Sequence, residues 1–111
     1  MARRLRWRRQ ARADIAAIRA YIALSSPANA KKVVAEIERV ADGLVHFPYA
    51  NRMVPELQDP QRRETFVYAY RLMYRVEAGC VRILRVVHGR RLLVNVPGGF
   101  EEAPQAAYKA A

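Results

Sequence analysis

The chain has 111 residues, of which 52% are hydrophobic, and its formal net charge is +10. This length suits one domain with one core, so no second domain is expected, and no long polar tract predicts wholesale disorder. The longest apolar runs fall well short of the ~20 residues that cross a bilayer, so no membrane partner is expected. By itself, the charge favours an anionic partner: nucleic acid, an acidic protein or an anionic membrane surface.

Arginine outnumbers lysine by 17 to 3. The bias suits anion binding through guanidinium forks, and it equally fits a GC-rich coding sequence. Cys80 is the only cysteine, which leaves no intrachain disulfide, and with only His46 and His88 beside it neither a zinc site nor any other cofactor is expected. The basic N-terminal segment lacks the apolar region of a signal peptide, so we expect a cytoplasmic protein.

The first half of the chain predicts a strand followed by two helices. Residues 3–9 alternate between arginines and the pair Leu5 and Trp7, which is typical of a short edge strand. Residues 11–25 predict a helix, with Asp14 in its first turn, where a carboxylate suits the helix dipole. The apolar stripe of this helix consists of Ala11, Ile15, Ile18 and Ile22.

Residues 27–46 predict a longer helix, with Ser26 as its N-cap and Pro27 at its first position. Its core stripe consists of Val33, Ile37, Val40 and Leu44, and a second apolar edge consists of Val34, Ala41 and Val45. This second edge either packs on the first helix or is open to a partner. Packing is favoured, because consecutive helices joined by a short turn form a hairpin.

The second half predicts three strands over residues 63–69, 70–77 and 80–87, after a connection over residues 48–62. Tyr70, Leu72, Tyr74 and Val76 alternate with Arg71, Met73, Arg75 and Glu77. Ala78-Gly79 predicts a tight hairpin turn, and the apolar 80–87 segment is typical of a strand with neighbours on both sides.

The element order predicts an α+β fold: an N-terminal strand and a helical hairpin packed on one face of a small antiparallel sheet. The other face is expected to carry Arg71 and Arg75 and to lead to His88, Arg90 and Arg91. Residues 1–97 would form the domain, and residues 98–111 a flexible tail.

Several short motifs follow one another in a characteristic order along residues 5–91. They include Ser26-Pro27, Phe47-Pro48, Val54-Pro55-Glu56-Leu57, Tyr70-Arg71-Leu72 and Val86-Val87-His88-Gly89-Arg90-Arg91. In this order they resemble the RelE/ParE superfamily of toxins from type II toxin–antitoxin systems, and within it the ParE-like branch. The resemblance implies a toxin with a cognate ParD-like antitoxin, in a hetero-oligomer. ParE-like members inhibit DNA gyrase, whereas RelE-like members cut mRNA on the ribosome.

Residue chemistry favours the gyrase inhibitor over the nuclease. An RNase needs a general base, a general acid and cations around the phosphate. RelE-like members carry lysines on the sheet and a tyrosine beyond the basic cluster, but here Lys31 and Lys32 lie on a predicted helix, and residues 92–97 contain no tyrosine. His88 is either a general base or a hydrogen-bonding strand-end residue. We therefore predict no catalytic residue and rank the ribosome-dependent nuclease second and a non-catalytic nucleic-acid-binding domain third.

Two surfaces are predicted. The target, DNA gyrase, would contact His88, Arg90, Arg91, Arg71 and Arg75, although Arg71 and Arg75 also suit cross-strand pairs with Glu64 and Glu77. The antitoxin would fold as a helix across Tyr21, Leu24, Val34 and Val45, or add a strand to a sheet edge. Direct DNA binding by the toxin alone is not expected.

Overall fold

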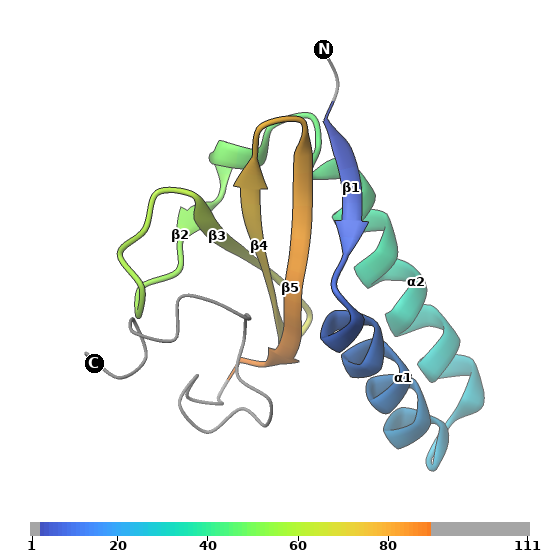
Figure 1. The fold of residues 1–111 in the computed structure, drawn as a ribbon. Helices are drawn as coiled ribbons and strands as arrows, with labels where there is room; N and C mark the ends of the chain where they lie inside the picture. Colours follow the sequence, from blue (N-terminus) through green and yellow to red (C-terminus); the bar gives the residue numbers. More distant parts are fainter. Residues whose placement is uncertain (1–2, 90–111) are drawn as a thin grey trace.

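The computed structural model describes residues 3–89. Two helices cover one face of a five-stranded sheet with the strand order β1-β5-β4-β3-β2 (Figure 1). The elements are β1 (Arg4–Trp7), α1 (Arg9–Ala23), α2 (Pro27–Gly43), the 3-10 helix η1 (Pro48–Ala50), β2 (Arg52–Met53), β3 (Arg62–Val67), β4 (Tyr70–Glu77) and β5 (Cys80–His88). The predicted α+β fold is confirmed, whereas Arg90, Arg91 and the tail of residues 98–111 lie outside the described residues.

The sheet mixes the two pairing directions. β1 is an edge strand, as predicted, and pairs in parallel with β5, while the other neighbouring pairs are antiparallel. β5 therefore has neighbours on both sides, which explains its almost continuous apolar sequence. Gly79 adopts a φ of 91° in the predicted turn between β4 and β5.

The two helices begin where local chemistry allows. Ser26 caps α2, because its Oγ accepts a hydrogen bond of 3.1 Å from the backbone N–H of Asn29, and Pro27 follows at the first position. α1 begins at Arg9, so Asp14 lies beyond its first turn. The predicted role of Asp14 at the helix dipole is therefore wrong, and its carboxylate has another partner.

The main core lies between the helices and the sheet. The helices contribute Ala11, Ile15, Ile18, Val34, Ile37, Ala41 and Leu44, and the strands contribute mainly Leu72, Tyr74, Val76, Val81, Ile83 and Val86. Val34 is only 2% exposed and Val45 is partly buried against this core. The second apolar edge of α2 thus packs inside the molecule, and an exposed Val34 is ruled out.

The outer face of the sheet carries a second, smaller core. Val54, Met73, Leu84 and Val87 are buried there, and Leu57 packs against them. The chain between β2 and β3 therefore lies over the outer face, because Val54 and Leu57 belong to it. The face predicted to carry Arg71 and Arg75 thus also carries an apolar core and a covering segment of chain.

β3 ends earlier than predicted. Tyr68 has a φ of 53°, the left-handed region that non-glycine residues seldom adopt, and this turn reverses the chain into β4. Tyr68 thus belongs to the turn rather than to the strand predicted over residues 63–69. The side chains of Phe66 and Tyr68 are both exposed at this turn.

Candidate functional site

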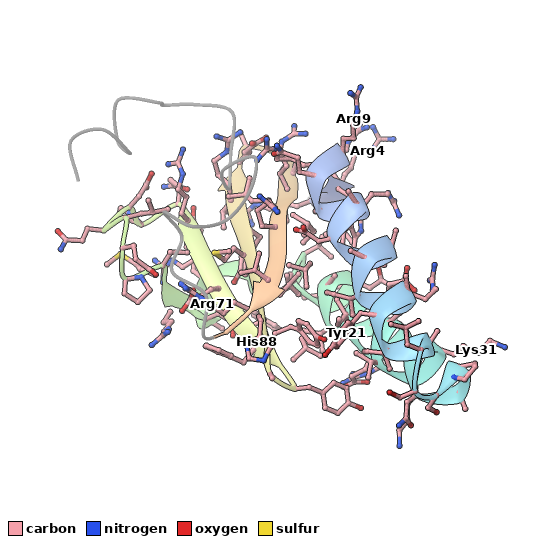
Figure 2. All side chains as sticks on the ribbon, turned by 90° about the horizontal axis from the view of Figure 1, so that it is seen from below. Arg4, Arg9, Tyr21, Lys31, Arg71 and His88 are labelled. Atoms are coloured by element: carbon pink, nitrogen blue, oxygen red, sulfur yellow. The ribbon has the colours of Figure 1, made fainter. Side chains whose placement is uncertain are left out.

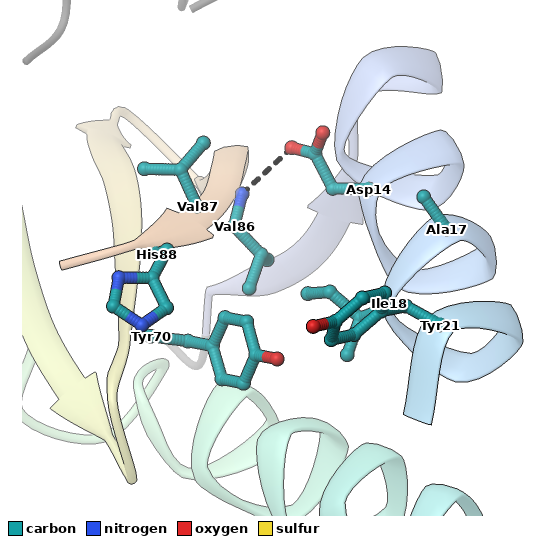
Figure 3. A pocket seen from close by; sticks show the side chains of 8 residues that line it. All are labelled: Asp14, Ala17, Ile18, Tyr21, Tyr70, Val86, Val87 and His88. Carbon is teal, nitrogen blue, oxygen red and sulfur yellow. Dashed lines mark hydrogen bonds between the residues drawn. The ribbon is translucent and has the colours of Figure 1, made fainter. Parts of the chain in front are cut away.

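A cavity of about 600 Å³ lies between α1 and the adjoining ends of β4 and β5 (Figure 3). Its lining residues are Asp14, Ala17, Ile18, Tyr21, Tyr70, Val86, Val87 and His88. The rings of Tyr70 and His88 meet edge to face, with centroids 5.9 Å apart and planes at 76°. Among the predicted target contacts that the structure describes, His88 lines this cavity and Arg71 and Arg75 do not. His88 is held by an aromatic neighbour at the end of β5.

Asp14 forms the acidic wall of the cavity. Its carboxylate accepts hydrogen bonds of 2.8 Å from Nε and Nη2 of Arg85 and from the backbone N–H of Val86. These three bonds join α1 to β5 (the Val86 bond is dashed in Figure 3). Asp14 therefore holds the wall of the cavity together.

Gly89 continues the chain directly after His88. Its N–H donates to the carbonyl of Ala69 over 2.7 Å. A Cβ atom here would meet Phe66 Cε2 at 2.9 Å and Ala69 O at 3.0 Å. Glycine is needed because backbone and ring approach so closely, and the end of β5 is thereby fixed against the β3–β4 turn. The sequence analysis missed this role, although a glycine between His88 and Arg90 was a visible signal.

Arg71 is not exposed as predicted. Its side chain is 5% exposed, and it lies over the strands, whereas Arg4 and Arg9 project outward (Figure 2). Nε and Nη2 donate to Glu64 Oε1 over 2.9 and 2.5 Å, and Nη1 and Nη2 donate to Glu56 over 3.0 and 2.8 Å. The hydrogen bonds from Arg71 hold the pKa of the Glu56 carboxyl below its usual value. The cross-strand pair with Glu64 is confirmed, and Arg71 fastens the β2–β3 connection to the sheet.

Arg75 keeps part of its predicted exposure. Its side chain is 31% exposed, and its Nε donates to Glu77 over 2.7 Å. Both residues belong to β4, so this is a pair within one strand and the predicted cross-strand pair is wrong. Arg82 donates to the same carboxylate over 3.1 and 3.2 Å. The hydrogen bond from Arg82, followed by that from Arg75, lowers the pKa of Glu77 to about 2. Glu77 is therefore a fixed negative charge between two arginines at neutral pH.

The predicted antitoxin residues divide into two groups. Tyr21 is 73% exposed and Leu24 is 84% exposed, both near the C-terminal end of α1. Val34 and Val45, on α2 and just after it, contribute instead to the core. The structure thus brings together Tyr21 and the cavity beside His88 but separates Val34 from that surface.

Residues 3–89 contain neither a metal-binding cluster nor a helix suited to a bilayer. No group of three or more His, Cys, Asp or Glu side chains there could hold a metal ion. Neither helix of this part of the chain is long and apolar enough to cross a bilayer.

Known proteins are similar to this chain in both sequence and fold. Residues 5–93 match the family model described as the ParE toxin of the type II toxin–antitoxin system parDE. A curated relative, "Toxin RelE2" of Caulobacter vibrioides, is 34% identical over 86 residues, which cover 78% of this chain and 94% of the relative. A solved structure, "Chromosomal ParDE TA system from P. aeruginosa", superposes with a TM-score of 0.66 at 27% identity and covers 78% of this chain and 96% of its own. Because the family model spans most of the sequence and the fold agrees, the chain belongs to the ParE toxin family, within the RelE/ParE superfamily of type II toxin–antitoxin systems.

Proposed function

We propose that the protein inhibits DNA gyrase and is neutralised by a cognate ParD-like antitoxin in a hetero-oligomeric complex. The main support is the pairing of four arginines on β4 and β5. Arg71 binds Glu56 and Glu64, Arg75 and Arg82 bind Glu77, and Arg85 binds Asp14. A nuclease needs such cations directed at a phosphate. Here each of them is matched by a carboxylate, which suits a protein-binding toxin better than an RNA-cleaving one.

The lysines of the described chain support the same choice. Within residues 3–89, Lys31 and Lys32 are the only lysines, and both are exposed on α2, away from the sheet. His88 packs edge to face on Tyr70, a contact that suits a strand-end role. The alternative of ribosome-dependent mRNA cleavage by His88 would therefore lack a second proton-transfer group of the lysine type on the sheet.

The target surface is proposed at the end of β5. His88 is exposed there, and the Gly89 bond to Ala69 holds the chain that leads to Arg90 and Arg91. Adjacent guanidinium forks beside a fixed strand end can bind carboxylates at a small ordering cost. Arg75 remains a candidate on the outer face, whereas Arg71 is withdrawn because its side chain is buried.

The antitoxin surface is proposed at the exposed apolar end of α1. A disordered, acidic antitoxin segment would gain apolar contact with Tyr21 and Leu24 as it folds, and it would offset part of the +10 charge. Under this proposal the toxin and its antitoxin act in the cytoplasm, and no cofactor is required.

Two assays on the purified full chain test the function. We expect inhibition of gyrase supercoiling that is relieved by the antitoxin, and no cleavage of mRNA on ribosomes. Arg90→Ala with Arg91→Ala should relieve gyrase inhibition and leave antitoxin binding intact, while Arg9→Ala with Arg19→Ala makes the same change in net charge elsewhere and should inhibit as the parent does. Ribosomal cleavage abolished by His88→Ala would promote the nuclease instead.

A matched pair of substitutions tests the antitoxin surface. Leu24→Asp should weaken the antitoxin complex about tenfold or more, because a charge would enter an apolar contact without a partner. Phe47→Asp changes a residue that is also well exposed, at 77%, but follows α2. It should bind the antitoxin as the parent does, and equal losses in the two variants would remove the site from α1.

A further inference from the structure

Four adjacent strands place an arginine in one row across the outer face of the sheet. Arg6 of β1 lies opposite Arg82 of β5, Arg82 lies opposite Arg75 of β4, and Arg75 lies opposite Arg62 of β3. Leu5, Trp7, Val76, Val81 and Ile83, the neighbours of these arginines along the strands, pack toward the helices. Because side chains alternate along a strand, the row of Arg6, Arg82, Arg75 and Arg62 faces away from the helices. We call it the arginine row.

Such a row is unfavourable for folding by itself. Like charges directly opposite one another on neighbouring strands destabilise a sheet. Two carboxylates offset part of this repulsion: Glu77 binds Arg75 and Arg82, and Asp59 binds Arg62. Neither carboxylate pairs with Arg6, so the repulsion is only partly compensated within the described chain.

The uncompensated charge gathers at the β1 end of the row. Arg4 and Arg6 are exposed on the edge strand, and no carboxylate within residues 3–89 pairs with either. Within residues 3–89, Arg4 and Arg6 therefore contribute two positive charges at this end of the sheet that no carboxylate there offsets. A surface that retains such an excess despite its folding cost is suited to binding an anion.

The row is accessible to a partner at Arg6, Arg82 and Arg75. Arg6 is exposed, and the side chains of Arg82 and Arg75 are 36% and 31% exposed, in contrast to the 5% of Arg71 on the same face. The side chain of Arg62, at the far end of the row, is 12% exposed. With strands spaced about 4.8 Å apart, three steps from Arg6 to Arg62 span about 14 Å, the length of about four residues of extended chain. A short peptide segment is therefore long enough to contact Arg6, Arg82 and Arg75 together.

We propose that the arginine row binds an acidic segment of a partner protein. The row already binds carboxylates, since Glu77 accepts hydrogen bonds from both Arg75 and Arg82. Arg forks bind carboxylates in two-bond geometry, so further acidic side chains fit beside Arg6 and Arg4. Charge complementarity thus identifies the chemistry of the occupant.

A continuous nucleic-acid backbone fits the row less well. Glu77 lies within it as a carboxylate whose pKa is lowered to about 2, and Asp59 lies at its other end. A chain of phosphates crossing the face would pass these two negative charges. The acidic residues of a polypeptide can instead be spaced so that they meet Arg4, Arg6 and the exposed sides of Arg75 and Arg82.

This inference deepens the proposed function. It rests on that proposal in one respect, namely that the target is a protein and not a nucleic acid. The probe is a synthetic ten-residue peptide of alternating Glu and Thr, titrated into the full chain by fluorescence anisotropy at low and physiological salt. Arg6→Gln with Arg82→Gln should weaken binding about tenfold, as expected for two partly exposed guanidiniums, and added salt should reduce this difference. Arg9→Gln with Arg19→Gln has the same net charge and should bind as the parent does.

Two results would overturn the inference. Equal peptide affinity in the two double variants would show that net charge alone attracts the peptide. A DNA duplex that binds the parent more tightly than the peptide does, and that loses binding in the Arg6 and Arg82 variant, would assign the row to nucleic acid. Since neither experiment contains gyrase, failure here would leave the supercoiling test of the proposed function standing.

Discussion

Asp14 of α1 and Arg85 of β5 form a doubly hydrogen-bonded ion pair between residues 71 positions apart in the sequence. Both side chains are largely buried, and the backbone N–H of Val86 donates a third bond to the same carboxylate. The pair therefore fixes how α1 lies along β5 and shapes the cavity that ends at His88.

Breaking this pair should destabilise the fold. Asp14→Ala should lower the free energy of unfolding by about 3 kcal/mol, because it leaves the Arg85 guanidinium buried without its counterion. Urea unfolding followed by circular dichroism measures the change. Arg39→Gln breaks an exposed pair with Glu36 and should leave the midpoint unchanged, so equal shifts in both variants would contradict the importance of burial.

Arg71 should behave as a structural residue. Arg71→Met should cost about 3 kcal/mol, because Glu64, whose side chain is 0% exposed, loses its buried partner and keeps only the largely exposed Arg52. Arg71→Met combined with Glu64→Met should recover most of that loss, since apolar side chains of similar volume often replace a buried ion pair well. Chemical denaturation of the three variants checks this, and a double variant no more stable than the single one would contradict it.

Acid should weaken the outer face through Glu77. The pKa of this carboxyl is lowered to about 2 in the folded protein, with hydrogen bonding by Arg82 as the main cause, against about 4.3 in an unfolded chain. A lowered folded-state pKa stabilises the fold above the unfolded value, and this contribution disappears as the pH falls from about 4.3 toward 2. The parent should therefore lose more stability than Glu77→Gln between pH 5 and pH 2.5 in urea titrations. Parallel losses would show that Glu77 is not responsible.

Two glycines should respond in opposite directions to the same substitution. Gly89→Ala should cost about 1–3 kcal/mol, because its Cβ would press on the Phe66 ring and the Ala69 carbonyl. Gly43→Ala meets nothing within 4 Å on the last residue of α2 and should stabilise the protein by about 0.5–1 kcal/mol. Thermal unfolding of the two variants distinguishes these outcomes, and a neutral Gly89→Ala would mean that the strand end can move.

Local chemistry made much of the fold predictable from sequence. The Ser26-Pro27 cap, the Ala78-Gly79 turn and the apolar stripes of the helices depend on residues a few positions apart. Each of these patterns strongly favours one local backbone conformation, so the predicted elements were found with shifts of only a few residues at their ends. The early end of β3 was missed, because Tyr68 adopts a left-handed backbone conformation that a tyrosine does not predict.

The sequence by itself determined that the chain is a small, basic α+β protein with two helices beside a strand meander, because these features follow from composition and periodicity. Only the tertiary structure decided which charges are exposed. Alternation placed Arg71 and Arg75 on the same face, yet the connection carrying Glu56 lies over that face and buries Arg71 while Arg75 remains partly accessible. Burial of Val34 in the main core and pairing of Asp14 with Arg85 likewise depend on distant segments. Sequence periodicity reports which side of an element is apolar, but the partner that covers each side is chosen by packing between distant segments.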